Sequence, residues 1–247
     1  MNPKPSSIVV GVGAEQGLGA ALCRKFASQG YHVFVAGRTR EKLDQVVSAI
    51  AAGGGSAEAV VTDTTKEQDV LALYDRAFAA AADRAPPDLV VFNAGNNRRI
   101  DFTDVTAEQF EEFWRIGCFG GFLVGREAAR RLVPLGRGTV LFTGASASLR
   151  GKPGFAQFAA AKAGLRMLSQ SMAREYGPQG LHVAHVVLDG AINGERLRAS
   201  RPERIAEKGE SGLLGLDAMA EAYWFIHRQP PSAWTQEVDL RPAKEAF

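Results

Sequence analysis

Residues 8–19 read IVVGVGAEQGLG, and this stretch decides the fold of the chain. Its apolar start, from Ile8 to Val12, is typical of a buried strand, and the residues after it predict a helix from about Leu18 to Gln29. Gly13, Gly17 and Gly19 lie between the two, where glycines let the backbone approach a pyrophosphate at the helix N-terminus. A glycine pattern alone is a weak sign, but its position at a first strand–helix turn favours a nucleotide site. A tight turn without a ligand is the alternative.

Strand-like and helical segments alternate along the rest of the chain. Further strands are expected at 32–36, 57–61, 89–92, 139–143, 183–188 and 234–240, with helices at 40–52, 66–82, 107–131 and 155–176. This alternation with short connections predicts a Rossmann-type α/β fold: one domain over residues 1–247, in which helices cover both faces of a doubly wound parallel sheet in three layers. Residues 193–215 break the rhythm. They are charged and predict a mobile loop or short helices over a site, or else a plain surface connection.

Composition narrows the functional classes. With 247 residues and 46% hydrophobic residues, the chain can bury the core of one large domain. The 29 Lys+Arg residues nearly balance the 27 Asp+Glu residues, which argues against a nucleic-acid partner. Cys23 and Cys118 are far apart, so we expect no metal site and no disulfide framework, and we predict a cytoplasmic location. The sequence has neither the apolar core of a signal peptide nor an apolar run long enough to span a membrane.

Several short motifs resemble those of the short-chain dehydrogenase/reductase family. The glycines of residues 12–19 match its Thr-Gly-x-x-x-Gly-x-Gly, with Val12 in place of Thr. Residues 93–95, Asn-Ala-Gly, match the motif that follows its fourth strand, and Asp63 matches the Asp that reads the adenine amine. The resemblance runs from about Ile8 to Gly190. It implies a cofactor half at about 1–100 and a catalytic half at about 101–247.

The resemblance also implies a nicotinamide cofactor. Members that use NAD place an acid at the end of the second strand, where this chain has Gly37 followed by Arg38. A guanidinium suits a 2′-phosphate, so we expect NADP(H), with NAD(H) as the alternative. NADP-using relatives often carry a basic residue in the glycine loop, at the position where this chain has Gln16. As an alternative to phosphate binding, Arg38 and Arg40 could form a solvated pair at a helix start. The implied cofactor contacts are Gly13, Glu15, Gln16, Gly17, Leu18, Gly19, Arg38, Asp63, Asn93, Ala94, Gly95, Lys162, Asp189 and Gly190.

The family's catalytic residues match this chain at one position of four. Its active-site helix carries Tyr-x-x-x-Lys, and here Lys162 is retained while Phe158 stands in the Tyr position. By the family's spacing, Ala145 stands in the position of the Ser that binds the carbonyl oxygen, and Gly117 in that of a helical Asn. A shift of one residue would instead place Ser146 in the Ser position. Phenyl and methyl side chains cannot donate a proton, so the resemblance implies a lower catalytic rate than is usual for the family.

Other polar residues near this implied site could contribute. Asp189 stands in the position of a family Pro beside the nicotinamide, where it could act as an acid or base or cap the next segment. Residues 96–99, Asn-Asn-Arg-Arg, could bind an anionic group at the substrate mouth or form a solvated turn. His182 and His185 are expected to be packed residues rather than catalytic ones.

Two functions therefore remain open. One is an NADP(H)-dependent oxidoreductase with an altered active site that acts on an unidentified carbonyl or alcohol. The other is a catalytically impaired cofactor-binding protein that senses the cofactor or engages a partner. The sequence does not decide whether the protein is an enzyme. The resemblance further implies a homodimer or homotetramer that pairs through the helices at 107–131 and 155–176.

Overall fold

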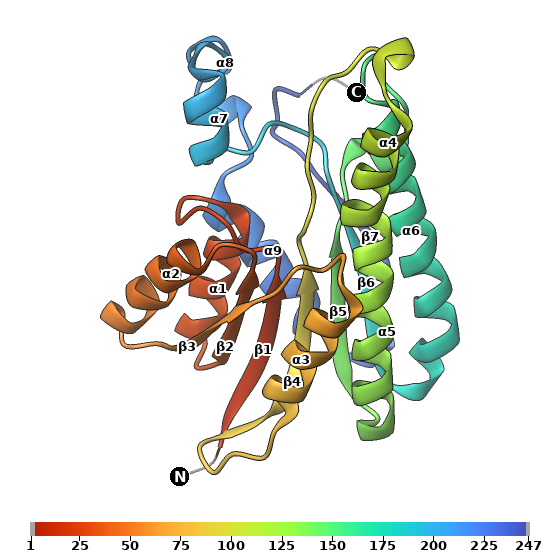
Figure 1. The fold of residues 1–247 in the computed structure, drawn as a ribbon. Helices are drawn as coiled ribbons and strands as arrows, with labels where there is room; N and C mark the ends of the chain where they lie inside the picture. The colour runs from red at the N-terminus through yellow and green to blue at the C-terminus, as the bar shows by residue number, and fades with distance from the viewer. Residues whose placement is uncertain (1–2, 246–247) are drawn as a thin grey trace.

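A parallel sheet of seven strands forms the centre of the computed structural model, which describes residues 3–245 (Figure 1). The strand order is β3-β2-β1-β4-β5-β6-β7, so the chain crosses over between β1 and β4. The strands are β1 (Lys4–Val10), β2 (His32–Gly37), β3 (Ser56–Val61), β4 (Arg84–Phe92), β5 (Gly138–Thr143), β6 (Leu181–Leu188) and β7 (Glu237–Leu240). This arrangement confirms the predicted single-domain α/β fold of the Rossmann type.

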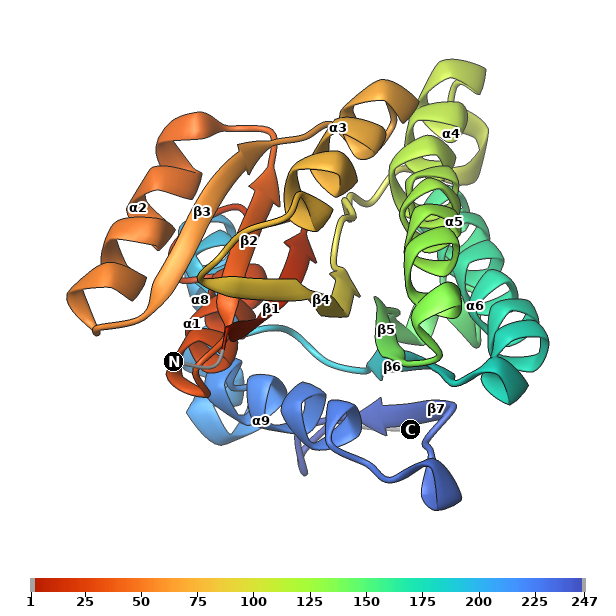
Figure 2. The same cartoon turned by 90° about the horizontal axis from the view of Figure 1, so that it is seen from below.

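Helices cover both faces of the sheet and enclose two apolar cores. The longer helices are α1 (Leu18–Ser28), α2 (Arg40–Ala52), α3 (Glu67–Phe78), α4 (Ala107–Trp114), α5 (Gly120–Leu132), α6 (Ala156–Tyr176) and α9 (Leu216–His227). On β1, Val9 faces the core under α1, α2 and α9, whereas Ile8 and Val10 face the core under α3, α5 and α6. Figures 1 and 2 show these two helical layers on either side of the sheet.

The ends of several elements differ from the sequence prediction. β1 ends at Val10 rather than Val12, because Gly11 has a φ of +86° and the amides of Gly11 and Val12 both bond the carbonyl of Ala36. The helix predicted at 66–82 ends at Phe78.

The segment predicted as one helix at 107–131 is divided by a π-helical turn over Arg115–Phe119. A Cβ atom at Gly121 would lie 2.3 Å from the side chain of Leu165 in α6. At Gly117, in the π turn, a Cβ would lie 3.0 Å from that of Ala161. Glycine at these two positions lets the segment approach α6 closely.

The segment at 193–215 contains two short helices, α7 (Glu195–Ser200) and α8 (Pro202–Lys208). Short helices were one of the alternatives predicted for this segment. Figure 1 shows them beyond the carboxyl edge of the sheet, away from the two helical layers. Of the helices between residues 3 and 245, none combines the length and the apolar character that crossing a bilayer requires.

Candidate functional site

The motifs identified in the sequence converge on the carboxyl edge of the sheet. The glycine loop follows β1, Arg38 follows β2, and Asp63 lies just beyond β3. Residues 93–95 follow β4, and Asp189 follows β6. Because the strands are parallel, these segments meet at one edge, on either side of the β1–β4 crossover. Ligands of open α/β sheets bind in the crevice at this position.

The glycine loop is packed on one side and open on the other. A Cβ atom at Gly19 would lie 3.0 Å from Cα of Val12, so a side chain there would press on the loop. The side-chain Nδ2 of Asn93 donates to the carbonyl of Gly11 at 3.4 Å and links the loop to the next motif. A Cβ at Gly13 would meet no atom within 4 Å. Gly17 is the N-cap of α1 and has no side chain to cap the helix, so the first amides of α1 can bind an anion.

Helix α7 packs onto this loop. The amide of Glu195 donates to the carbonyl of Gln16 at 2.8 Å, and a Cβ at Gly194 would lie 2.8 Å from the same oxygen. The guanidinium of Arg196 donates to the carbonyl of Asn97 at 2.6 Å. The start of α7 therefore joins the glycine loop to the segment after β4.

A hollow of about 320 Å³ lies beside β2 and β3. Two of its lining residues, Arg38 and Asp63, were predicted from the sequence, and Thr65 lies two residues after Asp63. The other lining residues were not predicted and come from α4 and the π turn: Glu108, Glu111, Glu112, Arg115 and Ile116. No local motif marks these residues, and only the fold brings α4 to this edge. Arg40, in contrast, pairs with Asp44 at 2.8 Å on the surface of α2.

Hydrogen bonds from the turn that follows Asp63 hold its carboxylate in place. Its Oδ1 accepts hydrogen bonds from the amide and the hydroxyl of Thr65, at 3.0 and 2.8 Å. Burial works to raise the pKa of Asp63, but these bonds and the charges of Lys66 and Arg38 outweigh it and hold the pKa below its usual range. Asp63 is therefore an anionic acceptor at neutral pH.

Lys162 lies at the centre of the edge. Its side chain is buried at 5% exposure, and its Nζ donates to the carbonyl of Thr143, the last residue of β5, at 2.8 Å. A Cβ at Gly95 would lie 3.3 Å from the same Nζ, so the fold brings the lysine to the Asn-Ala-Gly turn. Burial lowers the pKa of Lys162 to about 8.

The residues around Lys162 offer few proton donors. Phe158, one helical turn before it on α6, is half-buried. Ala145 is extended, and its carbonyl accepts from the hydroxyl of Ser148 at 2.7 Å. Gln157 is fully buried and donates to the carbonyl of Arg98 at 2.9 Å, so its side chain stabilises the loop after β4.

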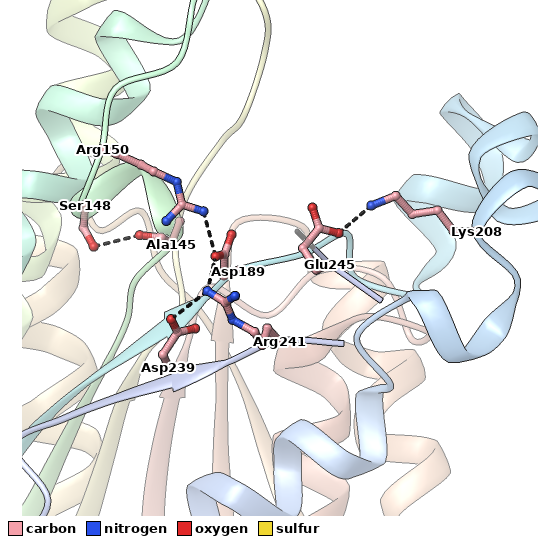
Figure 3. Close-up of polar contacts among 8 residues, drawn as sticks. All are labelled: Ala145, Ser148, Arg150, Asp189, Lys208, Asp239, Arg241 and Glu245. Atoms are coloured by element: carbon pink, nitrogen blue, oxygen red, sulfur yellow. Dashed lines mark hydrogen bonds and ion pairs between the residues drawn. The ribbon is translucent and has the colours of Figure 1, made fainter. Parts of the chain in front are cut away.

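Asp189 is held by two arginines (Figure 3). Its carboxylate is 2% exposed, and its Oδ2 accepts from Arg150 at 2.7 Å and from Arg241 at 2.8 Å. Burial would raise the pKa of Asp189, but hydrogen bonds from Arg150 and Ser146 and the two guanidinium charges hold it below its usual range. The side chain is a buried anion at neutral pH, which does not suit a proton donor.

The two histidines of β6 lie in the interior. Nδ1 of His185 faces Oε2 of Glu237 at 3.0 Å, and burial lowers the pKa of His185 to about 4, so the ring is neutral at pH 7 and donates to the carboxylate. The ring of His182 stacks on Trp234 with centroids 4.8 Å apart. Both arrangements fit packed residues.

Comparison with known proteins agrees with these motifs. The family model described as short chain dehydrogenase matches residues 7–204. A gluconate 5-dehydrogenase of Gluconobacter oxydans (strain 621H) is 32% identical over 228 residues, which cover 92% of this chain and 82% of that protein.

Solved structures share the fold. A short-chain dehydrogenase from Rhodopseudomonas palustris superposes with a TM-score of 0.81 at 38% identity, covering 97% of this chain and 100% of the other. A gluconate 5-dehydrogenase from Burkholderia cenocepacia J2315, in complex with NADP and tartrate, superposes with a TM-score of 0.83 at 21% identity, covering 97% and 94%. The agreement of the family model with relatives over nearly the full length leaves one conclusion: the chain belongs to the short-chain dehydrogenase family.

Proposed function

We propose that the protein binds NADP(H) and is an oxidoreductase of its family with an altered active site, acting on a carbonyl or alcohol substrate. The observation that carries the proposal is the position of Lys162. Its buried ammonium group lies beside the turn at Gly95, at the same sheet edge as the open glycine loop. An ammonium has three N–H donors, and the carbonyl of Thr143 takes one of them.

The residues present fit a dinucleotide. The free space at Gly13 and the N-terminus of α1 suit the pyrophosphate, and Arg38 with Asp63 suits the adenosine end. Arg38 supports NADP(H) over NAD(H), since its guanidinium can pair with a 2′-phosphate. Lys162 would hold the nicotinamide ribose by its other N–H donors.

The bound nicotinamide would supply the hydride chemistry, and the chain would supply position and protons. Here Phe158 replaces the tyrosine of the family pattern, Ala145 the serine and Gly117 the asparagine, so the usual proton donor and oxygen ligand are missing. Loss of a general acid costs about 10² to 10⁴ in rate, and loss of one oxyanion donor about 10² to 10³. We therefore expect turnover with simple carbonyls to be very slow.

A titration followed by a turnover assay tests the proposal. NADPH fluorescence should change on binding to the protein, and the Gly13→Ala variant should bind NADPH more weakly without loss of stability, because its new methyl group would fill only the space left for the ligand. Bound NADPH is then followed during addition of a panel of ketones and aldehydes. Absence of NADPH and NADH binding would contradict the proposal.

The second candidate is a cofactor sensor or partner-binding protein without turnover. The phenyl ring of Phe158 beside Lys162 favours it, because a ring without a hydroxyl cannot donate a proton. Tight NADPH binding with no oxidation across the panel would support this second function. Oxidation of NADPH by one class of carbonyl would exclude it.

A further inference from the structure

The guanidinium of Arg150 is fixed at the edge of the candidate site. Arg150 lies in the loop between Ala145 and α6, where its amide bonds the carbonyl of Ser146 at 3.0 Å. Its side chain reaches the buried Asp189, and Figure 3 shows the two residues joined beside Arg241. A long flexible side chain is thereby held in one place by a carboxylate that is itself enclosed.

Only part of this guanidinium is used by the ion pair. A guanidinium carries five N–H donors, and the hydrogen bond from Arg150 to Asp189 uses one of its terminal nitrogens, Nη2. The side chain of Arg150 is 37% exposed, against 17% for Arg241 and 2% for Asp189. Asp189 thus fixes Arg150 from within, while more than a third of the Arg150 side chain is exposed to solvent.

The position of Arg150 places it next to the reactive end of the site. Asp189 follows β6, and β6 pairs with β5, whose last residue, Thr143, accepts the hydrogen bond of Lys162. A group bound to Arg150 would lie over the carboxyl ends of these two strands, where ligands of such sheets bind.

The surrounding charges favour a small anion with one charge. Arg241 also pairs with Asp239, at 3.3 Å, and the carboxylates of Asp239 and Glu245 act on Arg150 in addition to Asp189. Because these carboxylates offset the charge of the guanidinium groups, the cluster has little long-range attraction for a polyanion. It does present a planar fork of donors, which matches the two oxygens of a carboxylate.

We propose that Arg150 binds the carboxylate of the substrate, and that the protein acts on, or binds, carbonyl compounds or alcohols that carry one carboxylate group. The inference rests on the proposed function and narrows its substrate class. Asp189 acts in this proposal as a positioning residue, because it orients the guanidinium in advance and so reduces the entropy lost on binding.

Binding to the NADPH-loaded protein tests the inference without turnover. Isothermal titration calorimetry would compare 4-oxocyclohexanecarboxylate with 4-oxocyclohexanecarboxamide, two ketones that differ in charge and little in shape. We expect the carboxylate to bind at least about 10-fold more tightly, since hydrogen bonds between charged partners are stronger than those between neutral ones. Arg150→Gln should remove this preference, and Arg150→Lys should retain part of it. Lys152→Gln, which removes an exposed charge from the same loop, should leave it unchanged.

The outcomes separate the two proposals. If neither NADPH nor NADH binds, the proposed function fails and this inference fails with it. If the cofactor binds but the wild-type protein binds the carboxylate no more tightly than the carboxamide, the inference alone is overturned. The same holds if Arg150→Gln weakens both ligands equally, because that result indicates a purely structural role for Arg150.

Discussion

Gly37 lies so close to Val12 that a Cβ atom at residue 37 would be 2.2 Å from the carbonyl oxygen of Val12. The same Cβ would lie 3.1 Å from the side chain of Leu43. An acid at this position would therefore displace the start of the glycine loop. This contact gives a steric reason for the glycine at the end of β2, and it supports the proposal that the next residue, Arg38, contacts the adenosine ribose.

We predict that NADPH binds more tightly than NADH and that Arg38 is the cause. Arg38→Asp should weaken NADPH binding by about 10- to 100-fold, because a charge-assisted pair is lost and a repulsive charge is gained. The preference should shrink or reverse. Arg40→Ala is the matched control, since Arg40 already pairs with Asp44. Equal dissociation constants for NADPH and NADH in the unmodified protein would show that the interpretation of Arg38 is wrong.

A second prediction concerns Gly144 and the ring of His185. A Cβ at Gly144 would lie 2.2 Å from Nε2 of His185, and the buried ring cannot move away easily because Nδ1 bonds Glu237. Glu237 is in turn held by Arg166 at 2.6 Å. Gly144→Ala should lower the free energy of unfolding by about 2–3 kcal/mol, as measured by urea denaturation.

Two further variants check this cause. Gly151→Ala should be nearly neutral, because a Cβ there would meet no atom within 4 Å. In a His185→Ala background, Gly144→Ala should lower the free energy of unfolding much less, since the ring that the new methyl group would meet is absent. Full additivity of the two changes would show that the ring is not the obstacle.

The sequence predicted the sheet and the meeting of its motifs, because periodicity and parallel strand order place every strand end at one edge. It could not predict contacts made by residues that carry no motif. Glu111 and Arg115 line the hollow beside Asp63 only because the π turn and α4 lie over that edge. Likewise, the two arginines on Asp189 come from the loop before α6 and from the residue after β7, 39 and 52 positions away in the chain.

A third prediction concerns the cost of burying Lys162. The pKa of Lys162 is about 8 in the folded protein, against 10.5 for an ordinary exposed lysine. Between these values the unfolded chain holds a proton that the folded protein has released, so stability should rise as the pH increases from about 8 to about 10. Below pH 8 the folded protein carries the full penalty, which is at most about 3.4 kcal/mol.

Lys162→Met should remove this pH-dependent part. At pH 7 the free energy of unfolding of the variant should exceed that of the wild type by about 1–3 kcal/mol, reduced by the contribution of the lost hydrogen bond to Thr143. This difference in stability should shrink towards pH 10. It should also bind NADPH more weakly. Lys152→Met, at an exposed position, is the control. Unchanged NADPH affinity in Lys162→Met would mean that the lysine does not contact the cofactor.

The last prediction concerns proton transfer. Phe158→Tyr adds one oxygen to a half-buried ring one turn before Lys162, and Ala145→Ser adds a hydroxyl at an extended residue. The nearby ammonium should lower the pKa of the new tyrosine from its usual value of about 10. The double variant should then show NADPH oxidation with an activated ketone that the wild type lacks.

The size of this gain should be limited. Gly117 has no side chain, and a larger residue there would press on Ala161, so the water relay implied for the family stays incomplete. Each single variant should gain less than the pair, because proton donor and oxygen ligand act together. Arg150→Gln in the double variant should reduce the rate for a keto acid but not for its amide. Fast turnover by the unmodified protein would contradict the prediction. It would require another proton donor, and Ser146 is the first to test because Asp189, whose pKa is held below its usual range, carries no proton at neutral pH.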